Sequence, residues 1–423
     1  MLSAKTIEIV KQTAPVVADH AETITRRFYT LMFAGNPEVQ AYFNPAHQHS
    51  GVQQRALAGA ICAYAANVDN LAALEGPVEL IAQKHCSLGI QPEHYPVVGK
   101  YLLMAIKDVL GDAATDEIIH AWSEAYGVLA EVFIDREQQI YSSQRDVAGG
   151  WNGYRKFLVQ QKLAETENVS SFYLVPADGG LLPHYEPGQY ITVALDERAP
   201  LTAPRNYSLS DRPGMGYFRI SVKREVGLSA DAPAGLVSNY LHDELHEGNI
   251  LQVGPPCGEF TLKSTDITEE PIVFISGGIG ITPVLAMFKH LAHCDWTAPV
   301  QFLHGARNGR SHVFAGEVRH IVERHSNFES HFRYDEPTTE DRHHARFDSE
   351  GLMDEEFLES HVPHDAHVYF CGPPPFMRLV YRALKARGFD ESKLHFEFFG
   401  PKLDIGHPHK ARPKSTRRRL QSV

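Results

Sequence analysis

The sequence predicts a protein of three domains, in which an all-α domain is followed by an antiparallel β-barrel and a doubly wound α/β domain. Apolar residues recur at helical spacing through residues 1–147, and short runs rich in β-branched and aromatic residues fill 148–265. Strands then alternate with helices around glycine turns through 266–401. The length of 423 residues agrees with this division, at roughly 150 residues per domain.

Composition and charge exclude several classes of protein. With 43% hydrophobic and 22% charged residues, the chain has ample material for a core. Its apolar runs stay short of the ~20 residues that a membrane span needs, and residues 1–15 lack the features of a secretory signal. The net charge of −12 argues against nucleic acid as a partner. We expect a cytoplasmic monomer that acts on small molecules, without integral membrane association.

Cysteines, histidines and the C-terminal tail give no metal site by themselves. The five cysteines are scattered, which excludes a cysteine-ligated zinc or iron–sulfur site. His361, His364 and His367 are spaced by three, but Pro363 interrupts any helix there, so we interpret them as surface residues. Residues 402–423 carry seven lysines and arginines and one acid. This basic tail is expected to be a disordered end, with contact to anions or a membrane surface as the alternative.

The first domain is helical throughout its length. Residues 21–33 place Ile24, Phe28, Leu31 and Met32 on one apolar face, and residues 98–110 and 117–141 repeat the pattern. Glycine and proline clusters separate these segments, and no alternating strand pattern interrupts them.

A histidine near the end of one helical segment has the surroundings of an axial ligand. Leu80 and Ile81 precede His85 on the same apolar face, a glycine–proline loop follows, and Tyr95 opens the next helix. A lone histidine on an apolar face is usually a core residue, so the residues alone leave both interpretations open. Neutral imidazole is a common haem ligand when its second ring nitrogen has a hydrogen-bond partner.

In the second domain, two short motifs suit a phosphate-containing cofactor. Arg205 opens the strand-like run at 205–208, and its planar guanidinium fits a pyrophosphate. Gly235 opens a helix whose free N–H groups can hold phosphate. Each motif alone is weak, because an ordinary strand has the same composition as residues 205–208. The insert at 226–234 is interpreted as surface decoration.

The third domain places a glycine turn between the strand at 271–276 and a helix. Glycines at such a turn let the backbone approach a pyrophosphate at the helix N-terminus. Cys371 ends a later strand, and we interpret it as part of a second turn, not as a nucleophile, because no base accompanies it. Arg307 ends the strand between them. No acidic residue lies in that segment, and the Arg307 side chain could bind a phosphate group.

Taken together, these motifs resemble those of bacterial and yeast flavohaemoglobins over essentially the whole chain. The resemblance is carried by the histidine segment at 84–96, RxYS at 205–208, GxGxTP at 278–283, CGPP at 371–374 and EFFGP at 397–401. It implies a globin fold for 1–147, an FAD-binding β-barrel for 148–265 and an NAD(P)-binding domain for 266–401.

For the helical domain, the resemblance implies a haem b site. His85 would be the iron ligand, Tyr95 and Glu137 its proximal partners, and Tyr29 and Gln53 the distal polar pair. The remaining residues expected at the haem and its edge are Phe43, Leu57 and Lys84.

For the other two domains, it implies flavin and nicotinamide sites. The Tyr207 ring would pack against the flavin ring system, the Ser208 hydroxyl would reach its N5 edge, and Phe399 would stack on it. The residues expected at FAD are Tyr190, Arg205, Asn206, Tyr207, Ser208, Gly235, Val237, Ser238, Glu397, Phe398, Phe399, Gly400 and Pro401. Those expected at the nicotinamide nucleotide are Gly277, Gly278, Ile279, Gly280, Ile281, Thr282, Pro283, Cys371, Gly372 and Pro373.

The function implied by this resemblance is that of a nitric oxide dioxygenase. Hydride from NADH or NADPH would reduce FAD, and FAD would pass single electrons to haem, where nitric oxide and oxygen become nitrate. Two alternatives stay open. One is a reductase of hydroperoxides or other acceptors, and the other is a sensor that binds oxygen or nitric oxide.

Overall fold

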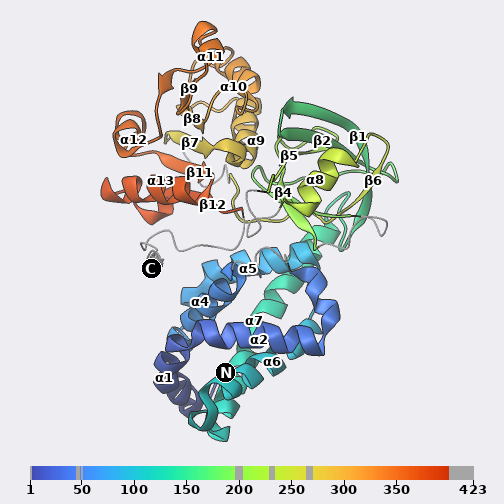
Figure 1. The fold of residues 1–423 in the computed structure, drawn as a ribbon, viewed down its shortest axis with the longest axis vertical. Coiled ribbons are helices and arrows are strands. Elements are labelled where there is room, and N and C mark those ends of the chain that lie inside the picture. The colour runs from blue at the N-terminus through green and yellow to red at the C-terminus, as the bar shows by residue number, and fades with distance from the viewer. Residues whose placement is uncertain are drawn as a thin grey trace, which may run out of the picture.

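The computed structural model of the protein describes residues 2–43, 48, 51–195, 203–227, 234–262 and 270–399. Gly400, Pro401, the basic tail at 402–423 and most of the insert at 226–234 lie outside the described residues. Three units follow one another along the chain, with the helical unit at one end and the two sheet units side by side at the other (Figure 1).

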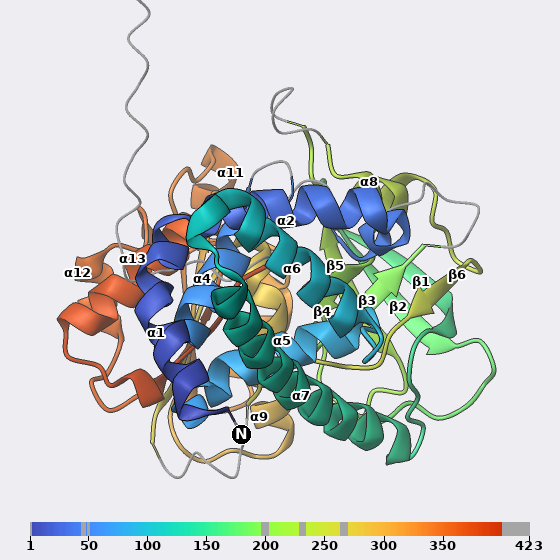
Figure 2. The ribbon, with the colours of Figure 1, turned by 90° about the horizontal axis from the view of Figure 1, so that it is seen from below.

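The first unit consists of helices packed around one apolar core. Its elements are α1 (Ala4–Asp19), α2 (Ala21–Gly35), η1 (Pro37–Tyr42), α4 (Val52–Ala66), η2 (Leu71–Leu74), α5 (Glu75–Leu88), α6 (His94–Leu110), η3 (Gly111–Ala113) and α7 (Asp116–Asp146). Ile24, Phe28 and Met32 are buried, as their spacing predicted. The α5 helix ends at Gly89, whose left-handed φ of 76° suits glycine as a cap. In Figure 2 the C-terminal half of α7 points toward the β-domain, which the chain then enters.

The second unit, the β-domain, is an antiparallel sheet with one helix. Its elements are β1 (Arg155–Thr166), β2 (Val169–Pro176), β3 (Tyr190–Ala194), β4 (Arg205–Ser208), β5 (Phe218–Lys223), α8 (Leu236–Asp243) and β6 (Ile250–Val253). The six strands are ordered β4-β3-β6-β1-β2-β5. A further antiparallel bridge joins Leu209, just after β4, to Ile220 on β5, so the two edge strands meet and the sheet closes. Phe157, Phe172 and Phe218 fill its interior.

The third unit, the α/β domain, is a parallel sheet between two layers of helices. It runs through β7 (Ile272–Gly277), η4 (Gly278–Gly280), α9 (Ile281–His293), β8 (Val300–Ala306), α10 (Ala315–Val322), β9 (Phe328–Tyr334), α11 (Thr339–His343), β10 (Ser349–Glu350), α12 (Glu355–His361), β11 (His367–Cys371), α13 (Pro374–Ala386), η5 (Glu391–Lys393) and β12 (Leu394–Glu397). The strand order is β10-β9-β8-β7-β11-β12, with every pairing parallel. The predicted fold class is therefore confirmed.

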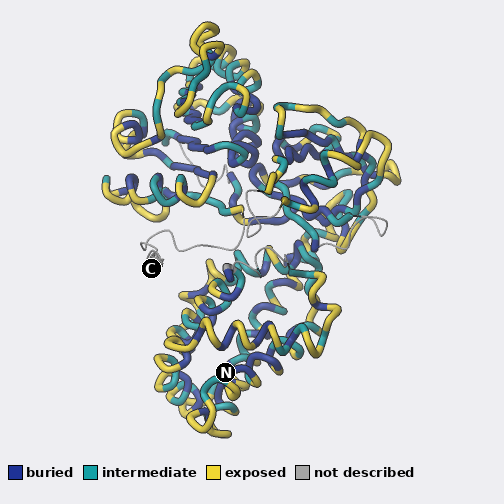
Figure 3. The backbone as a smooth tube through the Cα atoms, in the orientation of Figure 1, coloured by how far each residue is buried: buried dark blue, intermediate teal, exposed yellow. Residues whose placement is uncertain are grey.

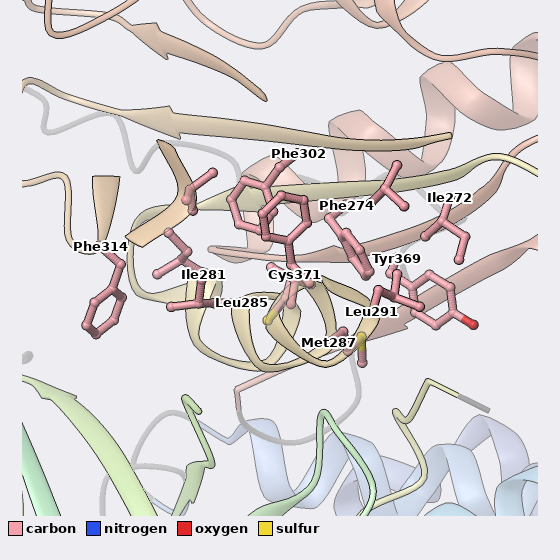
Figure 4. Packing of buried hydrophobic residues seen from close by; sticks show 14 of the residues in the cluster. Ile272, Phe274, Ile281, Leu285, Met287, Leu291, Phe302, Phe314, Tyr369 and Cys371 are labelled. Atoms are coloured by element: carbon pink, nitrogen blue, oxygen red, sulfur yellow. The ribbon is translucent and has the colours of Figure 1, made fainter. Parts of the chain in front are cut away.

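Successive residues of β7 explain why both faces of this sheet are covered. Phe274 packs in one apolar cluster with α9 and α10, whereas Val273 and Ile275 pack in another with α12 and α13. Figure 4 shows α9 presenting Leu285 and Leu291 to Phe274 and Phe302 of the sheet. Each side chain buried this completely contributes roughly 1.5–3 kcal/mol of hydrophobic free energy. Figure 3 shows the central strands of the parallel sheet as mostly buried and the outer helical faces as exposed.

The strand order places a crevice at one edge of the parallel sheet. From β7 the chain continues to β8, β9 and β10 on one side and later returns to β11 and β12 on the other. Ligands bind at such a switch point, outside the carboxyl ends of the two diverging strands. Here those ends are Gly277 of β7 and Cys371 of β11. Among the described residues, no helix is long and apolar enough to cross a membrane.

Candidate functional site

His85 lies at the end of α5 with one ring nitrogen held by two partners. Its Nδ1 donates to Glu137 Oε1 at 2.7 Å and lies 3.1 Å from the Tyr95 hydroxyl oxygen. The Tyr95 hydroxyl donates to the same carboxylate oxygen at 2.5 Å. With Nδ1 held as a donor, Nε2 is the nitrogen left to bind a ligand. The structure thus brings together the three predicted proximal residues.

Burial keeps the Tyr95 hydroxyl of this proximal group protonated. The Glu137 side chain is 3% exposed, whereas His85 is 32% exposed and so remains accessible. Burial, and then the hydrogen bond to Glu137, raise the pKa of Tyr95 far above its ordinary value, so the hydroxyl stays a donor. Phe133, one helical turn before Glu137, stacks on the Tyr95 ring at 6.4 Å between centroids. Phe133 was not predicted, although its spacing from Glu137 on α7 could have indicated it.

A second cluster in the helical domain contains the predicted distal residues. Burial raises the pKa of Tyr29 to about 12, and hydrogen bonds with Gln53 and Gln48 oppose that rise. The Phe43 ring lies 5.5 Å from the Tyr29 ring, and Leu57 packs in the same apolar cluster. Gln48 escaped the sequence analysis because it lies between two helical segments, where no periodicity marks a residue that faces inward.

The α5 helix also contacts the β-domain, through residues next to His85. The Lys84 ammonium lies 5.4 Å from the centre of the Tyr190 ring. Asn206 Nδ2 donates to Ser87 Oγ at 3.3 Å, and the backbone N–H of Gly258 donates to Gln83 Oε1 at 3.1 Å. One helix therefore carries the proximal histidine and a contact surface for strands β3 and β4 (Figure 1).

The side chain of Asn206 has a different environment from the one expected for a pure flavin contact. It accepts a hydrogen bond from Thr192 Oγ1 at 3.1 Å while donating to Ser87. Burial raises the pKa of Tyr190 well above its usual value, and hydrogen bonds from Ser87 and Asn206 oppose the rise. Ser87, Tyr190 and Asn206 therefore form a polar junction between two domains. Ser87 was not predicted, because nothing in its local sequence marks it as a contact to a residue 119 positions away.

The remaining residues expected at the flavin lie on adjacent strands of the β-domain. Strands β3 and β4 pair so that Tyr190 faces Ser208 and Ile191 faces Tyr207. Arg205 Nη1 donates to the carbonyl oxygen of Ala203 at 2.5 Å.

Gly235, Val237 and Ser238 form the start of α8, with Gly235 as its N-cap. A Cβ atom on Gly235 would lie 2.7 Å from Ser238 Oγ, so glycine allows the close turn.

The C-terminal strand brings a carboxyl group to the same region. Burial raises the pKa of Glu397, at the end of β12, to about 8, and the positive charge of Lys84 opposes that rise. Glu397 Oε2 is buried without a hydrogen-bond partner in the described part of the chain. A buried oxygen of this kind indicates a site built for an additional group. Phe398 is half-buried, and Phe399 is 50% exposed.

The two nucleotide turns of the α/β domain meet at the switch point of its sheet. Gly280 approaches the second turn so closely that a Cβ would lie 2.3 Å from the carbonyl oxygen of Cys371. Gly278 has a left-handed φ of 54°, and a Cβ built on it would meet nothing within 4 Å, which leaves open space beside the turn. The Phe376 ring packs against Gly277 and Gly372. The expected residues Ile279, Ile281, Thr282, Pro283 and Pro373 are part of these turns.

Two observations bear on the remaining interpretations of this domain. Burial raises the pKa of Cys371 well above its usual value, so its thiol stays neutral, as expected for a residue that is not a nucleophile. Glu336 Oε2 lies 3.5 Å from Arg307 Nε. Glu336 lies just after the neighbouring strand β9 and not in the segment of Arg307, so this contact does not test the expectation about that segment.

Comparison with known proteins identifies two families within the chain. Residues 26–133 match the Globin family, and residues 274–382 match the Oxidoreductase NAD-binding domain family. The Flavohemoprotein of Rhodopirellula baltica is 54% identical over 406 residues, which cover 96% of this chain and 99% of the relative.

Two solved structures agree with the sequence relatives. A crystal structure of flavohemoglobin from Malassezia yamatoensis with bound FAD and heme has a TM-score of 0.82 at 29% identity, covering 94% of this chain and 100% of that one. The flavohem-like FAD/NAD binding domain of nitric oxide dioxygenase from Vibrio cholerae has a TM-score of 0.52 at 34% identity, covering 59% of this chain and 100% of that one.

The chain joins a globin domain to an NAD-binding oxidoreductase domain. This combination defines the class of protein as an oxidoreductase that contains a globin domain. Within that class, the chain belongs to the flavohemoprotein family, as the identity with its relatives along nearly the whole length demonstrates.

Proposed function

We propose that the protein is a nitric oxide dioxygenase. It would convert nitric oxide and oxygen to nitrate, with electrons that pass from NADH or NADPH through FAD to haem. The observation that carries the proposal is the position of α5. This helix holds His85 against Glu137 and Tyr95 on one side, and on the other it contacts β3 and β4, where the flavin motif lies.

The residues of the helical domain fit a haem b group. His85 would bind the iron through Nε2, because Nδ1 is held by Glu137 and Tyr95. Phe43 and Leu57 would pack on the porphyrin, and Lys84 would lie at its edge. The hydrogen bond to a buried carboxylate increases the basicity of the imidazole, which favours redox chemistry over reversible oxygen carriage.

The residues of the other two domains fit FAD and a nicotinamide nucleotide. Tyr190, Tyr207 and Ser208 would hold the flavin ring, Arg205 and the start of α8 the pyrophosphate, and Glu397 would face the ring with its unpartnered Oε2. The open space beside Gly278 would take the nicotinamide nucleotide. Hydride carries two electrons whereas haem iron accepts one, and FAD supplies the conversion between them.

On the side of the haem opposite His85, the Tyr29 hydroxyl would donate a hydrogen bond to bound oxygen, which gains negative charge. Its raised pKa keeps the hydroxyl protonated at neutral pH. Gln53 and Gln48 are hydrogen-bonding neighbours of the Tyr29 hydroxyl, so the three side chains form one polar group inside the apolar cluster. Such a donor favours charged oxygen species over neutral ligands.

The domain limits stay those of the sequence analysis. We assign residues 1–147 to haem, 148–265 to FAD and 266–401 to the nicotinamide nucleotide. The first limit falls between α7 and β1, and the second falls within 263–269, outside the described residues. We further propose that the protein is a cytoplasmic monomer.

Rapid mixing of the reduced, oxygenated protein with nitric oxide tests the proposal. We expect nitrate to form faster than oxygen dissociates, and we expect NADH to regenerate the reduced protein. His85→Ala should lose haem absorbance while retaining NADH-dependent reduction of an artificial acceptor by the flavin. Release of oxygen without nitrate would identify a sensor, and preferential consumption of hydroperoxide would identify a reductase of that acceptor. Either result would overturn the proposal.

A further inference from the structure

Four charged side chains meet at the boundary between the β-domain and the α/β domain. Asp211 and Arg219 come from the β-domain, and Lys289 on α9 and Glu317 on α10 come from the α/β domain. Arg219 Nη1 lies 2.7 Å from Glu317 Oε1, and Lys289 Nζ lies 2.8 Å from Glu317 Oε2. Lys289 Nζ lies 2.5 Å from Asp211 Oδ1, and Arg219 Nη1 lies 3.8 Å from Asp211 Oδ2.

These contacts close a ring in which positive and negative charges alternate. Each domain contributes one cation and one anion, and each charge has an opposite charge from the other domain beside it. We call this set of four residues the charge ring. Alternation of this kind is satisfied in one relative position of the two domains, because a shift along the boundary would bring like charges together.

The β-domain half of the charge ring is buried and the α/β half is partly exposed. The side chains of Arg219 and Asp211 are 2% and 3% exposed, and those of Lys289 and Glu317 are 19% and 32% exposed. Burial alone would raise the pKa of Asp211, yet Arg219 and Lys289 hold it below its ordinary value. Buried ion pairs lose hydration about as much as they gain in attraction, so their best-supported role is to specify one arrangement.

Hydrogen bonds from neutral groups fix the β-domain half of the charge ring. Arg219 Nη2 donates to the carbonyl oxygen of Ser210, and the Tyr217 hydroxyl donates to Asp211 Oδ2 at 3.1 Å. The Tyr185 hydroxyl donates to the backbone oxygen of Asp211 at 2.7 Å. This half is therefore rigid, and the α/β domain has to adapt to it.

A strained residue completes the boundary on the α/β side. Phe314 precedes α10 with a φ of 62°, a left-handed conformation that is unfavourable for a bulky side chain. Its ring lies 4.6 Å from the Arg219 guanidinium, which can repay part of the strain through a cation–π contact. Figure 4 shows the Phe314 ring beside α9, at the opposite end of the cluster from Ile272.

The same helix links the charge ring to the nucleotide turn. The α9 helix begins at Ile281, directly after the glycine turn η4, and carries Lys289 two turns later. Strand β5, which carries Arg219, contacts η4 itself. Between these points, Met287 packs so closely on Gly188 of the β-domain that a Cβ on Gly188 would lie 2.4 Å from its methyl group. Any rotation of α9 would therefore move the turn relative to β3 and β4.

We infer that the charge ring of Asp211, Arg219, Lys289 and Glu317 is a positioning device that sets the nicotinamide turn against the flavin strands for hydride transfer. The inference rests on the proposed function, since it needs a nicotinamide and a flavin at those two places. None of the four is a catalytic residue; each acts through the position of α9 and β5. The ring should therefore control the rate of transfer within the bound complex and not the affinity for the nucleotide.

Anaerobic rapid mixing of the holoenzyme with NADH measures both quantities. Glu317→Gln and Lys289→Met each remove one charge from the α/β side with little change of shape. We expect the limiting rate of flavin reduction to fall at least about tenfold, since small misplacements of reacting groups have effects of that size. The NADH dissociation constant, taken from the dependence of the rate on NADH concentration, should change less than about twofold. The long-wavelength absorption of nicotinamide stacked on flavin should weaken in parallel.

Two matched variants separate positioning from a general loss of charge. Lys289→Arg retains the charge and should remain within about threefold of the wild-type rate, while Glu350→Gln removes an exposed ion pair with Arg342 inside the same domain and should have no effect. Wild-type rates in both Glu317→Gln and Lys289→Met would overturn the inference. So would a loss confined to the dissociation constant, or a rate for Lys289→Arg as low as for Lys289→Met. A wild-type flavin that NADH does not reduce would instead refute the proposed function.

Discussion

The Tyr29 hydroxyl is a single group on which the distal chemistry depends. Tyr29→Phe removes it and nearly preserves the shape of the side chain, so the surrounding cluster should keep its packing. A hydrogen bond to a charged group contributes about 1.5–3 kcal/mol, and about 1.4 kcal/mol corresponds to a factor of ten. Oxygen should therefore dissociate at least about tenfold faster from the variant, as measured by rapid mixing with carbon monoxide.

Carbon monoxide provides the control for this substitution, because it carries little charge when bound. Its own dissociation rate should barely change in Tyr29→Phe. An equal rise in both dissociation rates would mean that the effect is steric, and would remove Tyr29 from its role as donor.

The pKa of Tyr29 leads to a second prediction, on stability at high pH. The folded value of about 12 exceeds the ordinary value of 10, because burial disfavours the charged phenolate. The neutral hydroxyl therefore contributes stability that is complete below pH 10 and is lost as the pH rises toward 12. Over that interval, wild type should lose roughly 2 kcal/mol more of its free energy of unfolding than Tyr29→Phe. Denaturant unfolding of both proteins measures the difference at pH 9.5, about half a unit below the ordinary pKa, and at pH 11.5, about half a unit below the folded pKa. An equal loss of unfolding free energy in wild type and Tyr29→Phe would contradict the prediction.

Among the secondary-structure elements, those with a regular apolar pattern could be predicted and the others could not. The α2, α6 and α7 helices followed from apolar residues at helical spacing, and β7 from a continuous apolar run. The longest strand, β1, was not predicted, because much of it is exposed and carries polar residues that break the alternation. The two-residue strand β10 is too short for any pattern to indicate it.

The turn before β3 requires glycine at position 188. Gly188 has a φ of 103°, and a Cβ would lie 2.2 Å from the carbonyl oxygen of Phe260. Gly188→Ala adds backbone strain and a clash, and we expect it to lower the free energy of unfolding by at least about 2 kcal/mol. Gly216→Ala is the matched control, since its φ of 74° is also left-handed but its Cβ would meet nothing within 4 Å. Equal destabilisation of both variants in thermal or denaturant unfolding would show that the clash is relieved by movement.

For the whole molecule, the order of the domains could be predicted but their contacts could not. The contacts that place α5 on the β-domain join residues far apart in sequence, such as Ser87 with Asn206 and Gln83 with Gly258. The same holds for Arg219 and Glu317 in the charge ring. Sequence periodicity reports which face of an element is buried, and it carries no information about which distant residue covers that face. For that reason the sequence indicated local motifs, while Ser87, Gln48 and Glu336, which contact predicted residues from other segments, were missed.

The junction at α5 gives a prediction that separates the two electron-transfer steps. Ser87→Ala removes the hydroxyl that Asn206 contacts at 3.3 Å and that also bonds to Tyr190, at the place where the haem and flavin domains touch. We expect the rate of haem reduction by the flavin to fall severalfold, because the two domains lose a direct contact that fixes their approach. The rate at which NADH reduces the flavin should stay unchanged, because the partners of the Ser87 hydroxyl among the described residues are Lys84, Asn206 and Tyr190, and none of them belongs to the α/β domain. Both rates can be followed in one anaerobic mixing experiment, with haem and flavin absorbance recorded separately.

Ser143→Ala, at an exposed serine of α7 whose hydroxyl donates to the Gln139 carbonyl oxygen of the same helix, serves as the control. If Ser87→Ala slows both steps equally, the substitution disturbs the β-domain itself, and the junction is not a separate determinant of electron transfer to haem.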